Sequence, residues 1–140
     1  MVYGLRKIPP LYSRIIIATL ASFGLAGVLP ISIMELQTAN ACPHFGPVPI
    51  CHIVSIGYGL IFSSAVLKPI WKFGIFFIGW TPVFFLAANG ALLELLGKDV
   101  CPKFDNGWPK CFFSLALACA IIIPVLLNWF VKRSTSPTNR

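Results

Sequence analysis

The feature that most constrains this chain is a series of four long apolar runs without acidic residues, lysine or arginine. The runs cover residues 15–34, 53–67, 73–93 and 112–131, and the second can be extended back through His52 to residue 50. About 20 apolar residues in a helix span the hydrocarbon core of a bilayer. The runs are continuously apolar and do not alternate between apolar and polar residues, as the strands of a membrane β-barrel do. Helices are therefore favoured, and a helix satisfies its own backbone hydrogen bonds in lipid. We therefore expect an all-α integral membrane protein with four transmembrane helices.

The composition supports the same class of protein. Hydrophobic residues make up 57% of the 140 residues and charged residues only 11%, whereas soluble domains are about 25% charged. A secretory signal peptide that ends in Ala39-Asn40-Ala41 is an alternative interpretation of the first run. That run is longer than a usual signal-peptide core, so we expect a transmembrane helix there.

Basic residues concentrate on one side of the expected spans. Eight of the eleven precede the first span, separate the second from the third, or follow the fourth: Arg6, Lys7, Arg14, Lys68, Lys72, Lys132, Arg133 and Arg140. The other side holds three lysines and all four acids: Lys98, Lys103, Lys110, Glu35, Glu94, Asp99 and Asp105. The positive-inside rule predicts cytoplasmic termini in a bacterial inner or plasma membrane, with the two longer loops periplasmic or extracellular.

The formal net charge of +7 does not indicate a nucleic-acid partner. The basic residues lie at the ends of spans and form no patch with interleaved aromatic residues. Anionic lipid head groups are the simpler partner for such juxtamembrane cations. The lipid bilayer is therefore the first partner that we expect.

The two longer loops carry an internal repeat. Glu35, Cys42-Pro43 and Phe45 recur at an offset of 59 as Glu94, Cys101-Pro102 and Phe104. Pro49-x-Cys51 recurs at an offset of 60 as Pro109-x-Cys111, so the second loop is one residue longer. Each unit holds two spans, which predicts parallel repeats of a two-helix hairpin.

This repeat defines the expected organisation of a single membrane domain, residues 1–140. We expect an up-down-up-down bundle in which hairpin 15–67 is joined to hairpin 73–131 by a cytoplasmic link, residues 68–72. Residues 1–14 and 132–140 form the cytoplasmic ends. Small residues recur every four positions at Ala18, Ser22 and Ala26 and at Ser55, Gly59 and Ser63, a pattern typical of close helix contacts in lipid.

Four of the five cysteines lie in the two outward loops: Cys42, Cys51, Cys101 and Cys111. Disulfides form on the oxidising side of a membrane. Four cysteines allow three pairings, of which Cys42–Cys51 with Cys101–Cys111 is the local one. We expect two disulfide-bonded loops, and we expect Cys119, inside the fourth run, to pack as a small apolar residue.

A metal site is the alternative interpretation of the first loop. Cys42, His44, Cys51 and His52 lie within eleven positions, but their spacing matches no standard zinc pattern. The second loop keeps the cysteines and replaces both histidines. A duplicated disulfide explains this better than a duplicated metal site, and the residues themselves indicate no cofactor.

Other polar and aromatic residues give narrower predictions. We expect Glu35 and Glu94 to cap the outer loops by hydrogen bonding. The second hypothesis is that this pair of acids binds and releases protons near the outer membrane surface. Asn89 and Asn128 hydrogen-bond across the bundle. The four tryptophans, Trp71, Trp80, Trp108 and Trp129, anchor the chain at the membrane interfaces.

Four helices, cytoplasmic termini and a cysteine pair in each of two outward loops resemble the bacterial disulfide-bond formation protein B family. The vitamin K epoxide reductase family is similar. The resemblance implies that one pair passes electrons to a bound quinone and the other exchanges with a thioredoxin-like partner. Cys42 and Cys51 would then be the active pair, and Cys101 and Cys111 the relay. Both families carry a Cys-x-x-Cys pair, whereas the pairs here enclose eight and nine residues.

Two functions follow from these observations. The first is a small, non-enzymatic scaffold or accessory subunit that docks a larger membrane complex, or another copy of itself, through rigid disulfide-bonded loops. The second is a quinone-linked thiol–disulfide oxidoreductase that uses the loop cysteines. The sequence contains no serine–histidine–acid set and no phosphate-binding loop.

Overall fold

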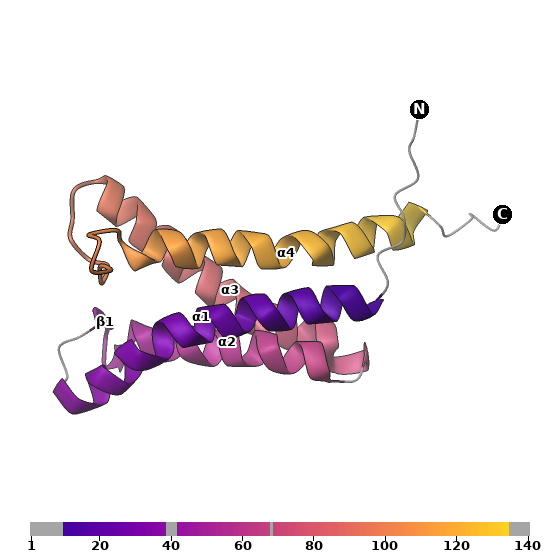
Figure 1. The fold of residues 1–140 in the computed structure, drawn as a ribbon, viewed down its shortest axis with the longest axis horizontal. Coiled ribbons are helices and arrows are strands. Elements are labelled where there is room, and N and C mark those ends of the chain that lie inside the picture. Colours follow the sequence, from indigo (N-terminus) through magenta and orange to yellow (C-terminus); the bar gives the residue numbers. More distant parts are fainter. Residues whose placement is uncertain (1–9, 39–41, 68, 135–140) are drawn as a thin grey trace.

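The computed structural model describes residues 10–38, 42–67 and 69–134. The fold consists of four helices: α1 Pro10–Thr38, α2 Ile50–Val66, α3 Pro69–Leu95 and α4 Lys110–Ser134. The helices run side by side with alternating direction (Figure 1). The α1–α2 and α3–α4 loops lie together at one end, which we name the loop end, and the α2–α3 connection lies at the opposite, link end. The expected four-helix, all-α fold is confirmed, with a two-stranded hairpin added in the first loop.

Three helices are long and apolar enough to cross a membrane: Leu11–Thr38, Lys72–Leu95 and Lys110–Phe130. The fourth apolar helix, α2, has only 17 residues, which gives it a length of about 26 Å. Large apolar side chains such as Phe23 and Ile78 lie exposed on the outside of the bundle, as expected for surfaces that face lipid. These features are those of a small multi-pass membrane protein.

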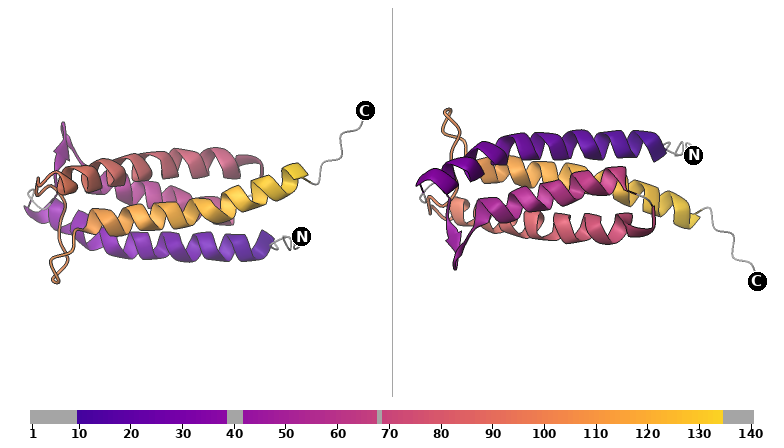
Figure 2. Two further views of the ribbon diagram at one scale, coloured as in Figure 1. Left: turned by 90° about the horizontal axis from the view of Figure 1, so that it is seen from above. Right: turned by 90° about the horizontal axis from the view of Figure 1, so that it is seen from below.

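The helices form a closed ring in which each packs against its neighbours. Helix α1 contacts α2 and α4, and α3 contacts the same two helices (Figure 2). The closest approach joins α2 to α3: a Cβ atom at Gly79 would lie 2.7 Å from the carbonyl oxygen of Gly57. Only glycine fits at this crossing. Gly59, which the small-residue pattern had indicated, has open space beside it.

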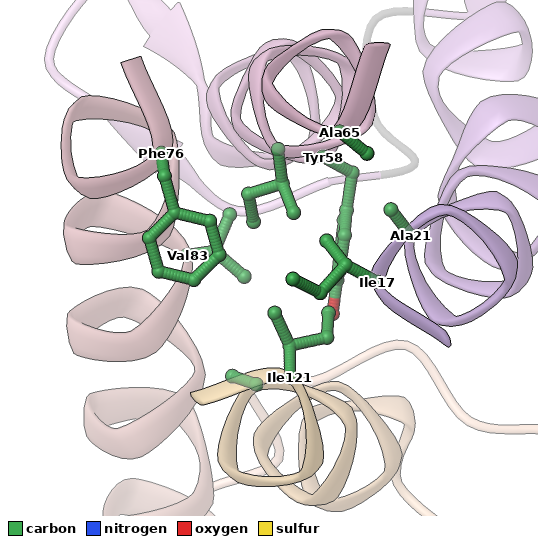
Figure 3. Close-up of a cluster of buried hydrophobic side chains, with 9 residues drawn as sticks. Ile17, Ala21, Tyr58, Ala65, Phe76, Val83 and Ile121 are labelled. Atoms are coloured by element: carbon green, nitrogen blue, oxygen red, sulfur yellow. The ribbon is translucent and has the colours of Figure 1, made fainter. Parts of the chain in front are cut away.

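The hydrophobic core fills the middle and link end of the bundle. Side chains from all four helices point toward one another there (Figure 3): Ile17, Ala21, Tyr58, Ile61, Ala65, Phe76, Val83, Ala118 and Ile121. Tyr58 is fully buried, and its ring lies so close to Gly24 that a Cβ atom there would be 2.4 Å from Tyr58 Cε1. Its hydroxyl lies 3.0 Å from Ser114 Oγ on α4. Tyr58 therefore links three helices at the boundary between the core and the loop end.

Two predictions about polar groups in the spans are wrong. Trp80 lies in the middle of α3, half-buried, and its Nε1–H donates to the carbonyl oxygen of Ala118 at 2.9 Å. It therefore joins α3 to α4 and is no interface anchor. Asn89 donates to the carbonyl oxygen of Phe85 in its own helix, at 2.9 Å, and makes no cross-bundle bond within the described residues.

Candidate functional site

The first loop is closed by the disulfide Cys42–Cys51. Between the cysteines, strands β1 (His44–Phe45) and β2 (Val48–Pro49) form a short antiparallel hairpin. Gly46 supplies the positive φ of +66° that the tight turn requires. The backbone N–H of Ile50 donates to the carbonyl oxygen of Pro43 at 3.1 Å. The loop therefore has a regular backbone, and α2 begins directly after it.

Glu35, near the end of α1, anchors this loop. Its side chain is only 3% exposed. One carboxylate oxygen accepts the backbone N–H of Cys42 at 2.8 Å, and the other lies 3.2 Å from His44 Nε2. A buried carboxylate is stable only with such donors. The expectation that Glu35 caps the outer loop by hydrogen bonding is confirmed.

The second loop repeats the same backbone construction. Cys101 and Cys111 form its disulfide, and Lys103 bridges to Pro109 as His44 pairs with Pro49. The backbone N–H of Lys110 donates to the carbonyl oxygen of Pro102 at 2.9 Å. These contacts join positions that the sequence repeat had matched. The local pairing of the four cysteines, one of three that the sequence allowed, is the one that forms.

The acid in the second loop has different partners. Lys103 Nζ lies 3.6 Å from Glu94 Oε1 and 2.5 Å from Asp99 Oδ1. Glu94 Oε2 is buried and has no hydrogen-bond partner among the described residues. The hydrogen bond from Lys103 and its charge lower the pKa of Asp99, and the same contact raises the pKa of Lys103. The second loop thus has an exposed ion pair where the first has a buried hydrogen-bond network.

Both loops also contact a neighbouring helix, the second through its disulfide and the first through a backbone carbonyl group. A Cβ atom at Gly90 on α3 would lie 2.7 Å from Cys111 Sγ and 3.1 Å from Cys101 Sγ, so the second disulfide packs directly on the α3 backbone. On the first side, Ser32 Oγ donates to the carbonyl oxygen of Cys51 at 3.2 Å and lies 2.7 Å from Ser55 Oγ. Both loops are therefore held against the bundle.

Below the two loops, the helices surround a cavity of about 500 Å³. All four helices contribute apolar wall residues, among them Gly27, Val28, Val54, Leu86, Leu93 and Leu117. Tyr58 lies at its deep end, where the core begins. Cys51, Cys101 and Cys111 also line the cavity, so both disulfides border the same space. Gly27, Asn89 and Phe113 line it and are exposed, which makes it accessible from outside the bundle.

The sequence did not predict this cavity, although it named several of the residues around it. The glycines at the loop-end half of the spans, Gly24, Gly27 and Gly90, were the available signal. The alternative metal ligands do not converge: Cys42 and Cys51 are bonded to each other, and His44 contacts Glu35. In the described part of the chain, no group of three or more His, Cys, Asp or Glu residues could hold a metal ion. Cys119 lies exposed on α4.

No protein-family model, curated protein or solved structure matches this chain. The resemblance to the disulfide-bond formation protein B and vitamin K epoxide reductase families therefore stays at the level of four apolar helices and two disulfides.

Proposed function

We propose that this protein is a non-enzymatic accessory subunit of a larger membrane complex, and that its two disulfide-bonded loops form the docking surface. We place this surface on the extracytoplasmic side, with both termini in the cytoplasm. Eight of the eleven basic residues belong in the sequence to the terminal segments and the α2–α3 link, among them the described Arg14 and Lys72, whereas the loop side holds three: Lys98, Lys103 and Lys110. That charge distribution supports the orientation by the positive-inside rule.

The observation that carries the proposal is that one rigid construction is used twice at the same end of the bundle. Each loop is closed by a disulfide and by an equivalent backbone hydrogen bond across its base. A surface that is already ordered loses little conformational entropy on binding. Such loops suit a docking role better than flexible connections of the same length would.

The outer surface of the loops also carries exposed apolar side chains. Trp108 is 71% exposed, and Val48 is exposed as well. Both lie between helices, outside the candidate spans. Tryptophan is enriched at the centres of protein interfaces. The partner that fits is a membrane protein with an apolar patch at the same membrane surface.

The burial of the cysteines favours a structural role for the disulfides. Cys42, Cys51 and Cys101 are buried, and thiol–disulfide exchange requires access of the attacking thiolate to a sulfur atom. This burial opposes rapid exchange with a soluble thiol protein.

One experiment tests the docking proposal directly. The full chain is expressed in its own membranes, extracted in a mild non-ionic detergent, and its protein mass is measured by light scattering after size exclusion. We expect a mass well above that of one 15.3 kDa chain, and a shift to the single-chain mass in Trp108→Ala. The control is Ile78→Ala, an exposed apolar residue on α3, which should leave the complex intact.

Two outcomes would overturn the proposal. A wild-type chain that is monomeric in every mild detergent has no stable complex. If two differently tagged copies of the chain purify together and account for the whole mass, the partner is a second copy and the larger complex is wrong.

The second candidate is the quinone-linked thiol–disulfide oxidoreductase, and one observation favours it. Cys51, Cys101 and Cys111 border one apolar cavity, whose volume lies in the range of about 300–1,000 Å³ for small-molecule sites. In this reaction, a partner dithiol reduces a loop disulfide and becomes oxidised itself. The two loop thiols then re-form their disulfide and transfer two electrons and two protons to the quinone, which leaves as quinol.

A redox titration separates the two candidates. Membranes are poised at a series of potentials, free thiols are trapped, and the loop peptides are identified by mass spectrometry. Structural disulfides stay oxidised to potentials below about −300 mV. If one pair titrates near about −200 mV and the other does not, the oxidoreductase replaces the accessory subunit as the better hypothesis.

A further inference from the structure

The cavity below the loops has two chemically different ends. Toward the core, its lining includes Gly24, Leu86 and Leu117 and reaches Tyr58, whose hydroxyl is hydrogen-bonded to Ser114. Toward the loops, its lining includes His44, Lys110 and the ring of Phe104. A site of this shape suits a molecule with an apolar body and a polar head.

At the polar end, the described part of the chain places one lysine without a matching acid. Lys110 lines the cavity, is half-buried, and makes no ion pair with any described residue. Its Nζ atom lies 5.0 Å from the centre of the Phe104 ring, a contact weaker than a charge-assisted hydrogen bond to a carboxylate. His44 also lines the cavity, but the carboxylate of Glu35 lies beside it. No aspartate or glutamate of the described ranges lines the cavity.

The dimensions limit the apolar part of the ligand. From Cys111 to Leu117, the cavity follows α4 for six residues, a depth of about 9 Å at the helical rise of about 1.5 Å per residue. This depth fits one acyl chain of moderate length. A two-chain phospholipid needs a much larger volume than the cavity offers.

We propose that the cavity binds a single-chain fatty acid, with its carboxylate at Lys110 and its acyl chain directed toward Tyr58. The exposed positions of Gly27 and Phe113 on the cavity wall give such a chain a route from the surrounding lipid. This site goes beyond the proposed docking role and does not depend on it, because the ligand lies inside the bundle and the docking surface lies outside it.

The test uses the full oxidised chain in non-ionic detergent micelles and decanoate labelled with ¹³C at its carboxyl carbon. We expect a saturable carboxyl NMR signal that is distinct from the signal of micelle-dissolved acid. Lys110→Met should weaken binding at least tenfold, because a charge-assisted contact is lost. Lys98→Met, which changes an exposed lysine outside the cavity, should leave the affinity unchanged.

A second pair of variants tests the cavity itself. A Cβ atom at Gly27 meets nothing within 4 Å, and Gly27 lines the cavity, so Gly27→Leu should narrow the cavity and weaken binding at least tenfold. Gly74→Leu is the matched control, because Gly74 also has open space but does not line the cavity. Circular dichroism and thiol trapping show whether each variant keeps its helices and disulfides.

Four results would overturn the proposal. The absence of a saturable signal removes the site, and so does unchanged decanoate binding in both Lys110→Met and Gly27→Leu. If decanol binds as tightly as decanoate, Lys110 does not recognise a carboxylate. If lysophosphatidic acid binds and decanoate does not, the anion is a phosphate and the fatty acid is the wrong ligand. None of these results depends on the mass of the detergent-extracted complex, so the docking proposal stands or fails separately.

Discussion

The two disulfide-bonded loops have the same backbone and differ in how they are anchored. In both, the backbone N–H of the first helical residue donates to the carbonyl oxygen of the proline that follows the first cysteine. The distance is 3.1 Å from Ile50 to Pro43 and 2.9 Å from Lys110 to Pro102. In the first loop, Glu35 is buried and holds the N–H of Cys42 at 2.8 Å. In the second, Lys103 divides its charge between Glu94 and the exposed Asp99. The disulfide and backbone therefore define the common construction, and the side-chain charges make the first loop the more firmly anchored one.

The largest expected effect is the loss of either disulfide. The bridged cysteines are 9 and 10 residues apart, and closing a loop of this length stabilises a fold by about 3 kcal/mol on the chain-entropy model. We expect Cys42→Ser with Cys51→Ser, and Cys101→Ser with Cys111→Ser, to lower the free energy of unfolding by similar amounts. Unfolding in mixed detergent micelles measures both values. A large difference between them would show that the two loops are not equivalent.

The next effect belongs to the second loop alone. Gly90→Ala places a Cβ atom 2.7 Å from Cys111 Sγ, and such overpacking costs about 1–3 kcal/mol. The control is Gly74→Ala on the same helix, where a Cβ atom meets nothing within 4 Å. The same unfolding assay compares the two variants. Equal stability would mean that the second disulfide does not rest on α3.

The buried carboxylate should matter more in the first loop than in the second. Glu35→Ala leaves the N–H of Cys42 without its acceptor, and hydrogen bonds to charged groups contribute about 1.5–3 kcal/mol. Glu94→Ala removes only a contact to a partly exposed lysine, worth about 0–1 kcal/mol. Unfolding free energies rank the two variants, and amide exchange at Cys42 should accelerate only in the first. An equal loss of stability in both variants would contradict the difference in anchoring.

The smallest effect concerns the exposed pair Asp99–Lys103. Because Lys103 lowers the pKa of Asp99, the pair stabilises the second loop above the ordinary aspartate pKa of about 3.9. That contribution is lost as the pH falls through the lowered value. In NMR titrations of the Asp99 carboxyl carbon, Lys103→Met should raise the pKa to its ordinary range, and salt should reduce the difference. Lys98→Met is the matched control. A pKa of Asp99 that does not change in Lys103→Met would exclude the pair in solution.

Much of the fold was predictable because membrane insertion depends on local properties of the sequence. The runs at 15–34, 53–67, 73–93 and 112–131 all lie in or closely match the four helices. The cysteine repeat also pointed to the local disulfides, since short loops bring their ends together easily. Glu35 was placed correctly as a cap because it lies just before the loop that it holds.

The errors all concern contacts between helices. The roles of Trp80 and Asn89 were predicted from the position of each residue along its apolar run. Their actual hydrogen-bond partners depend on how each helix is rotated about its axis. The small-residue pattern indicated Gly59, whereas the close contact joins Gly57 to Gly79. A rotation of one or two residues around a helix changes which side chain meets the neighbour, and every face of a membrane helix is apolar. Hydrophobicity therefore cannot identify the buried face.

The sequence by itself determined the class of the protein, the number of its helices and the repeated cysteine loops, because hydrophobic length and short-range loop closure are properties of contiguous residues. Only the tertiary structure decided that both disulfides border one cavity, that Tyr58 lines it where the core begins, and that Lys110 lines it without an ion pair to any described residue. These features join residues from four helices that lie far apart in the chain. Their positions follow from the rotation and crossing of the packed helices, which no local pattern encodes.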